Sequence, residues 1–127
     1  MIRSTLSACV LAATLLGGCA VMSSAEPPVK VTDGVLVNRA GMTLYTFDRD
    51  PVGAGKSVCN GQCAANWPPL AAPADAKASE PYSIVVRDDG TRQWAYKGKP
   101  LYLWVRDQKP GDRTGDGVNG VWRLARP

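Results

Sequence analysis

The chain carries one aromatic pattern twice, and this duplication constrains its fold more than any other feature. The segment Gly41–Asp50 aligns without gaps on Gly98–Asp107, and each copy reads Tyr-x-aromatic-x-x-Asp. The motif residues are Tyr45, Phe47 and Asp50 in the first copy and Tyr102, Trp104 and Asp107 in the second. A tryptophan closes each half, Trp67 in the first and Trp122 in the second. This self-similarity indicates an internal duplication in which two related units share one core.

The geometry of a β-strand gives the repeated pattern a physical meaning. Residues two apart lie on the same face of a strand, so the two aromatic residues of each copy share a face. Leu44 in the first copy, and Leu101 with Leu103 in the second, then take the opposite face. If the copies lie side by side, their rings form one cluster, each ring burying on the order of 150–250 Å². Aromatic residues at this period favour a structural core over a ligand platform.

The two aspartates of the pattern, Asp50 and Asp107, lie where a strand gives way to a loop containing glycine and proline. A carboxylate at such a place accepts backbone N–H bonds and holds the turn. A chemical alternative stays open. Asp48, Asp50 and Asp107 could supply a carboxylate pair for acid–base chemistry if the two repeats face each other.

Short β-rich runs separated by turn residues make up most of the remaining chain. With 127 residues and 13.5 kDa, the protein has room for one compact domain. The predicted strands are Val35–Val37, Met42–Phe47, Ser83–Arg87, Thr91–Tyr96, Pro100–Val105 and Val121–Ala125. The segment Pro68–Pro81 is rich in alanine and proline and predicts an irregular connection. We expect a mainly β domain of two related antiparallel, hairpin-containing halves, at about 34–70 and 83–126.

The N-terminal segment has the layout of an export signal. A short start with one basic residue, Arg3, is followed by the apolar run Ala8–Leu16 and then by Leu16-Gly17-Gly18-Cys19. The run is too short to span a hydrocarbon layer of about 30 Å. The segment resembles a bacterial lipoprotein signal, which predicts a signal peptide at 1–18, acylation of Cys19, a tether at 19–30 and a domain at 31–127. Cleavage after Ser23-Ser24-Ala25, releasing a soluble protein, is the alternative.

The cysteines agree with an exported location. Cys9 leaves with the signal and Cys19 takes the lipid, so the folded part keeps Cys59 and Cys63. In an oxidising compartment this pair is most simply a disulfide. Its spacing of four residues brings the two Cα atoms within the roughly 4.4–6.8 Å that a disulfide accepts if the segment forms a helical turn. A redox-active pair is the sharper alternative, although thioredoxin-like motifs have a two-residue spacer.

Composition excludes several classes of site. The chain has no histidine, which excludes an imidazole base and a His-ligated zinc. Its formal net charge is +4, but the basic residues are scattered along the sequence and do not form the stripe typical of nucleic-acid binding. Asp112 and Asp116 are weak metal candidates within an EF-hand-like spacing, but Arg123 stands where the bidentate glutamate belongs. A glycine-rich turn explains that stretch better, and no cofactor is expected.

The combination of motifs is similar to one known family. Beside the repeated pattern, it consists of the cysteine pair followed by Asn66-Trp67-Pro68-Pro69-Leu70, the segment Tyr96–Tyr102, and Pro110-Gly111-Asp112 through Trp122. These features resemble the bacterial predicted lipoproteins called secreted repeat of unknown function, over nearly all of the chain from about Gly34 to Arg126. The resemblance implies an exported, usually lipid-anchored protein. It supplies no catalytic residues.

The sequence therefore predicts a lipid-anchored protein of the cell envelope that acts as a non-catalytic binding or structural module. Its expected partner is the membrane, through the lipid on Cys19, with no nucleic acid. Ala20 follows the cysteine where lipoproteins retained in the inner membrane usually carry aspartate, so the resemblance favours the outer membrane, facing the periplasm. Two alternatives are an envelope enzyme or redox protein that uses the aspartates or the thiols, and a small-molecule or metal binder that uses the aromatic cluster.

Overall fold

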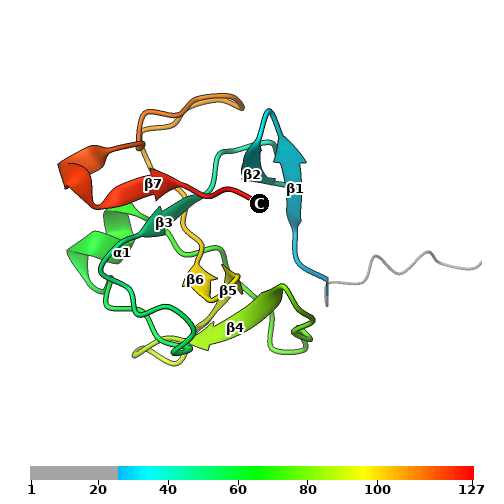
Figure 1. The fold of residues 1–127 in the computed structure, drawn as a ribbon. Coiled ribbons are helices and arrows are strands. Elements are labelled where there is room, and N and C mark those ends of the chain that lie inside the picture. Colours follow the sequence, from blue (N-terminus) through cyan, green and yellow to red (C-terminus); the bar gives the residue numbers. More distant parts are fainter. Residues whose placement is uncertain (1–25) are drawn as a thin grey trace, which may run out of the picture.

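The computed structural model describes residues 26–127, which form a mainly β domain of short elements (Figure 1). In chain order these are β1 (Val29–Thr32), β2 (Val35–Asn38), β3 (Tyr45–Phe47), α1 (Gln62–Asn66), β4 (Tyr82–Val86), β5 (Arg92–Tyr96), β6 (Lys99–Pro100), the 3₁₀ turn η1 (Val118–Gly120) and β7 (Trp122–Leu124). The signal peptide predicted at 1–18, the acylation site Cys19 and most of the predicted tether lie outside these residues. Within the described range, no helix has the length and hydropathy needed to cross a membrane.

The strands form three small antiparallel sheets. β1 pairs with β2, β3 pairs with β7, and β4, β5 and β6 form the third sheet. The last strand of the chain therefore closes against the first half, as the red β7 beside the teal β3 shows in Figure 1. Isolated bridges from Tyr102 to Tyr45 and to Pro69 connect the sheets. The two halves are thus interleaved.

The domain begins earlier than the sequence predicts. The predicted tether ends at residue 30, but β1 starts at Val29, which pairs with Asn38 of β2. The two strands are joined by Asp33 and Gly34, whose φ angles of 49° and 76° make a two-residue turn. Asp-Gly is a favoured sequence for this left-handed turn. The prolines at 27 and 28 suggested a tether, but the four residues that follow them, Val29–Thr32, are folded onto β2 by the Asp33-Gly34 turn.

Most other predicted strands are present to within one residue at each end. The exceptions are the two copies of the repeated pattern. The run Met42–Phe47 is a regular strand only in β3, while its Thr43 makes an isolated bridge to Val37. The run Pro100–Val105 is regular only in β6, because Tyr102 leaves β5 to bridge both Tyr45 and Pro69. Pairing with the other repeat replaces a longer hairpin in both places.

Two apolar clusters fill the interior, one on each side of the repeated pattern. The leucine cluster consists of Leu36, Leu44, Leu70, Ala72, Ala76, Trp94, Leu101 and Ala125, with Leu103 packed against it. The aromatic cluster consists of Tyr45, Cys59, Trp67, Tyr102 and Trp122, with Phe47 and Trp104 among the residues packed against it. The alternation expected from strand geometry is therefore present, and the rings of both copies lie together.

Candidate functional site

The repeated pattern meets its own copy at the centre of the molecule. The Tyr45 N–H donates to the Tyr102 carbonyl at 2.8 Å, and the Tyr102 N–H donates to the Tyr45 carbonyl at 3.0 Å. Both tyrosines are fully buried. This reciprocal pair relates the two repeats by an approximate twofold symmetry.

The side chains of the pattern cross between the repeats. The Tyr45 hydroxyl donates to Asp107 Oδ2 at 2.6 Å, and the Tyr102 hydroxyl donates to Asp50 Oδ2. Each tyrosine therefore bonds the aspartate of the other copy, an arrangement that we call the Tyr–Asp crossover. The sequence shows which residues correspond, but the partner of each tyrosine depends on how the repeats dock.

The remaining oxygen of each carboxylate holds a loop of its own repeat. Asp50 Oδ1 accepts the Val58 N–H at 2.8 Å. Asp107 Oδ1 accepts both the N–H and the hydroxyl of Thr114, at 3.0 and 2.6 Å. These are the turn-holding bonds expected for a carboxylate at the end of a strand. The described residues thus occupy both oxygens of each aspartate.

Each tyrosine oxygen also accepts a hydrogen bond. Ser57 Oγ lies 2.5 Å from the Tyr102 hydroxyl and donates to it, because that hydroxyl donates its single proton to Asp50. The Gly115 N–H donates to the Tyr45 hydroxyl at 3.2 Å. Burial first, and then the bond to a carboxylate, raises the pKa of both tyrosines well above their ordinary value of 10. Both therefore stay neutral donors at physiological pH.

Four rings stack beside the crossover in a column that alternates between the repeats. Its order is Phe47, Trp122, Trp67 and Trp104, with ring centres 4.4, 3.7 and 3.9 Å apart. Tyr45 meets Trp67 edge-on at 5.4 Å, and Tyr102 meets Trp122 edge-on at 5.1 Å. Stacked and edge-on pairs each add to the free energy of burial. The ring column is thus a second contact between the repeats.

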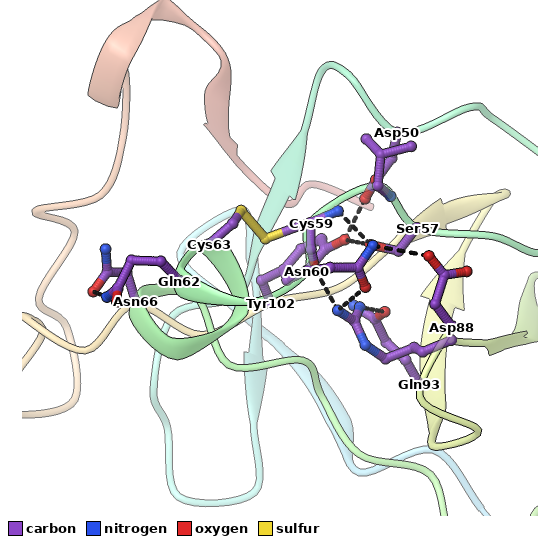
Figure 2. The surroundings of a disulfide bond; sticks show 12 residues. Asp50, Ser57, Cys59, Asn60, Gln62, Cys63, Asn66, Asp88, Gln93 and Tyr102 are labelled. Carbon is purple, nitrogen blue, oxygen red and sulfur yellow. Dashed lines mark hydrogen bonds between the residues drawn. A yellow bond between two sulfur atoms is a disulfide. The ribbon is translucent and has the colours of Figure 1, made fainter.

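The predicted pair Cys59 and Cys63 forms a disulfide with its Cα atoms 5.2 Å apart, at the start of α1. Cys59 is fully buried in the aromatic cluster, while Cys63 is partly exposed. Figure 2 shows Ser57 and Tyr102 beside this disulfide, so the covalent link lies next to one arm of the crossover. The Cys59 N–H donates to Ser57 Oγ at 3.1 Å.

One buried charged residue near the disulfide was not predicted from the sequence. Arg87 is only 5% exposed, and its guanidinium donates to the Cys59 carbonyl and, at 2.7 Å, to Gln93 Oε1. Gln93 in turn donates to the Leu101 carbonyl at 2.7 Å. A charged residue at the end of a predicted strand is typical of the surface, so the sequence carried no signal for this buried arginine. It connects the disulfide loop to the three-stranded sheet.

Of the two weak metal candidates, Asp112 has partners within the fold. Asp112 Oδ2 accepts the N–H groups of Gln108 and Lys109, at 2.9 and 3.2 Å, and these bonds help to lower the pKa of its carboxyl. Asp116 is exposed. Across residues 26–127, no three Asp, Glu or Cys side chains gather in a way that could hold a metal ion. Residues 114–117 of the EF-hand-like stretch form a turn in this fold.

The three aspartates considered for acid–base chemistry each bond to different partners. Asp50 and Asp107 belong to opposite arms of the crossover, and Asp48 forms a two-pronged pair with Arg123 Nε at 3.0 and 2.9 Å. The pair between Asp48 and Arg123 is exposed at the surface. None of the three carboxylates is bonded to another.

Two segments of the chain, residues 28–71 and 83–126, match one family model, which is described as a secreted repeat of unknown function and is named for lipoproteins. The two matched segments are the two halves that cross at Tyr45 and Tyr102. The search of curated proteins and the search of solved structures find no match to this chain.

Proposed function

This chain belongs to the lipoprotein family described as a secreted repeat of unknown function, and from that membership we propose that it is a lipid-anchored protein of the bacterial cell envelope, acting as a non-catalytic binding or structural module. The Tyr–Asp crossover is the observation that supports a non-catalytic role. The tyrosines and aspartates of the pattern bond to each other across the repeats, and their hydroxyl and carboxylate oxygens are occupied within the fold. In this proposal, the pattern joins the two repeats into one rigid body.

A structural role and a catalytic role predict opposite effects on stability. Catalytic carboxylates are commonly held at a cost in stability, so that their removal is neutral or stabilising. Loss of a buried hydrogen-bonded carboxylate costs about 1–3 kcal/mol. We therefore expect Asp50→Asn and Asp107→Asn each to lower the free energy of unfolding by about 1–3 kcal/mol, measured by urea denaturation. The matched control is Asp48→Asn, which breaks only an exposed ion pair and costs less than about 1 kcal/mol. A neutral or stabilising effect of Asp50→Asn or Asp107→Asn would overturn the proposal.

The lipid anchor rests on the export signal and on the family. Two or more acyl chains, at about 0.8 kcal/mol per buried methylene, hold a protein on a membrane stably. We expect the mature chain to begin at Cys19 with acyl chains in its mass spectrum, and to fractionate with membranes. Cys19→Ala removes both properties, while the control Cys9→Ala leaves them unchanged. A mature chain that begins at an unmodified Glu26 would contradict the anchor and indicate soluble secretion.

The redox alternative has its own test at the disulfide. Cys59 is fully buried, and reactive thiols are accessible and have a low pKa. We expect the pair to resist reduction by glutathione in the folded protein and to react only after unfolding. Thiol counting with and without denaturant measures this. Ready reduction of the folded protein would favour the redox protein over the structural module.

A further inference from the structure

A groove of about 380 Å³ lies on the side of β3 opposite the aromatic motif residues. Thr46 contributes to its wall, and as the residue between Tyr45 and Phe47 it points away from the ring column. Leu101 and Leu124 supply apolar lining. The volume is within the range of small-molecule sites. This surface is separate from the Tyr–Asp crossover.

The charged lining of the groove is strongly basic. Four cationic side chains line it, two from the β5–β6 hairpin and two from the end of the chain, against one carboxylate, that of Asp116. The four are Lys97, Lys99, Arg123 and Arg126. They are far apart in sequence, which is why the basic residues looked scattered. The fold brings them to one place because β7 returns to pair with β3.

Little of this positive charge is neutralised within the described part of the chain. Arg123 pairs with Asp48 at the surface, and Arg126 has only a 3.5 Å hydrogen bond to the Gly34 carbonyl. Lys97 and Lys99 form no ion pair with any residue between 26 and 127. The Lys97 Nζ lies 5.5 Å from the centre of the Tyr96 ring, another lining residue. The groove therefore presents a net positive charge to solvent.

The turn that carries the lysines is held in an unusual conformation. Lys97 and Gly98 have φ angles of 48° and 78°, matching the Asp33-Gly34 turn, where aspartate suits the left-handed backbone. Lysine is disfavoured at such a φ, and outliers of this kind concentrate at functional sites. The Gly53 N–H donates to the Gly98 carbonyl at 2.9 Å, and a Cβ on Gly98 would lie 2.7 Å from the Gly53 nitrogen. The backbone that positions both lysines is therefore fixed.

From the charge, the fixed turn and the small-molecule size of the groove together, we infer that this groove binds a phosphate-bearing molecule. The Arg126 guanidinium and the two lysine ammonium groups match the several acceptor oxygens of a phosphate, for which arginine offers paired donors and lysine a point charge. The apolar lining accommodates the group attached to the phosphate. The source is either a soluble phosphate ester or a phospholipid headgroup. The inference goes beyond the proposed function and does not depend on the anchor at Cys19.

Binding is tested on the full chain carrying Cys19→Ser, so that acylation cannot hold it on a membrane. Two ligands are tested. Binding of glycerol 3-phosphate is measured by calorimetry, and binding to vesicles of phosphatidylcholine with or without phosphatidylglycerol is measured by cosedimentation. Lys97→Gln/Lys99→Gln removes two lysines from the groove. The matched control is Lys30→Gln/Lys77→Gln, which removes the same charge from two exposed positions elsewhere.

We expect the groove variant to weaken binding about tenfold or more, while the control stays within about twofold of the parent. Binding of glycerol 3-phosphate with this pattern identifies a soluble ester as the ligand source. Binding confined to vesicles with phosphatidylglycerol, with the same pattern, identifies a lipid headgroup. Absence of binding in both arms, or an equal loss in the control variant, overturns the inference. These outcomes are independent of the mass of the mature N-terminus, which tests the anchor.

Discussion

The two repeats reach the same ring column by different routes. In the first repeat, the chain passes through the Cys59–Cys63 disulfide and α1 before Trp67. In the second, it passes through a glycine-rich stretch and the single turn of η1 before Trp122. Both tryptophans then stack on each other at 3.7 Å. The same position in the core is therefore supported covalently in one repeat and by backbone packing in the other.

The gap-free alignment of the two copies, continued beyond Asp50 and Asp107, places Ser57 opposite Thr114. The difference between the repeats is sharpest at the residues that follow these two. Val58, in the first repeat, is 56% exposed to solvent. Gly115, in the second, lies so close to the core that a Cβ there would be 2.8 Å from the Trp67 ring and 2.9 Å from the Tyr45 ring. The backbone at 115 thus packs directly on rings of the first repeat. A duplicated unit can keep its interface while each copy changes the loop that supports it.

The largest effect is expected from the paired tryptophans, which should behave alike if the approximate symmetry governs stability. Trp67→Ala and Trp122→Ala each remove one central ring of the column and leave a cavity, which costs about 3–5 kcal/mol. Urea unfolding followed by circular dichroism measures both. Trp104→Phe is the control, because it introduces the residue that the first repeat carries there, and it should cost less than about 1.5 kcal/mol. A much smaller loss for one of the two alanine variants would break the equivalence of the repeats.

The next effect separates the two loops. Gly115→Ala forces a methyl group against Trp67 and Tyr45, and such overpacking costs up to about 3 kcal/mol. Val58→Ala, at the corresponding place, should change the free energy of unfolding by less than about 0.5 kcal/mol, because the side chain is exposed. Thermal unfolding of the two variants side by side decides this. Equal losses would show that both loops pack on the core in the same way.

The sequence predicted the parts of this fold that depend on local pattern. The alternation of Leu44 with Tyr45, and of Leu101 with Tyr102, was enough to place the rings of the two copies on one face and these leucines on the other. The fold class and the two repeats followed from the same pattern and are confirmed. Strand β1 was missed because its hairpin depends on two residues, Asp33 and Gly34, that follow a segment with the composition of a tether.

What the sequence could not supply are the contacts made when the repeats dock. The pairing of Tyr45 with Asp107 rather than Asp50 is a property of the interface between copies, and no local spacing encodes it. The groove is a similar case, since Lys97 and Arg123 become neighbours only when β7 returns to β3. The closest signal was the correspondence of Ser57 with Thr114. It marked a shared position, but not its bonds to the crossover.

The disulfide gives a smaller effect, and only in the first repeat. A loop this short yields about 2 kcal/mol from chain entropy, so Cys59→Ala/Cys63→Ala should destabilise the domain by about that amount. Reductant should lower the stability of the wild type once it has been added to the unfolded chain, and should leave the double variant unchanged. Denaturation with and without reductant measures the difference. Combining the variant with Gly115→Ala tests whether the two loops act independently, because distant effects add. A wild type indifferent to complete reduction would mean that the covalent link adds nothing to the packing.

The smallest expected effect, counted per pH unit, is on the free energy of unfolding in alkaline solution. It tests both tyrosine–aspartate bonds of the crossover together. Because the folded-state pKa of Tyr45 and of Tyr102 is raised above 10, the folded protein keeps protons that the unfolded chain releases. Stability is therefore full below pH 10 and falls above it, by about 1.4 kcal/mol per pH unit for each tyrosine. Burial also raises the pKa of Tyr82, so the decisive quantity is the slope of each variant relative to the wild type. Tyr45→Phe and Tyr102→Phe should each reduce the slope of unfolding free energy between about pH 10 and 12 by one proton. Unequal reductions would show that one tyrosine ionises in the folded state and that the two arms differ.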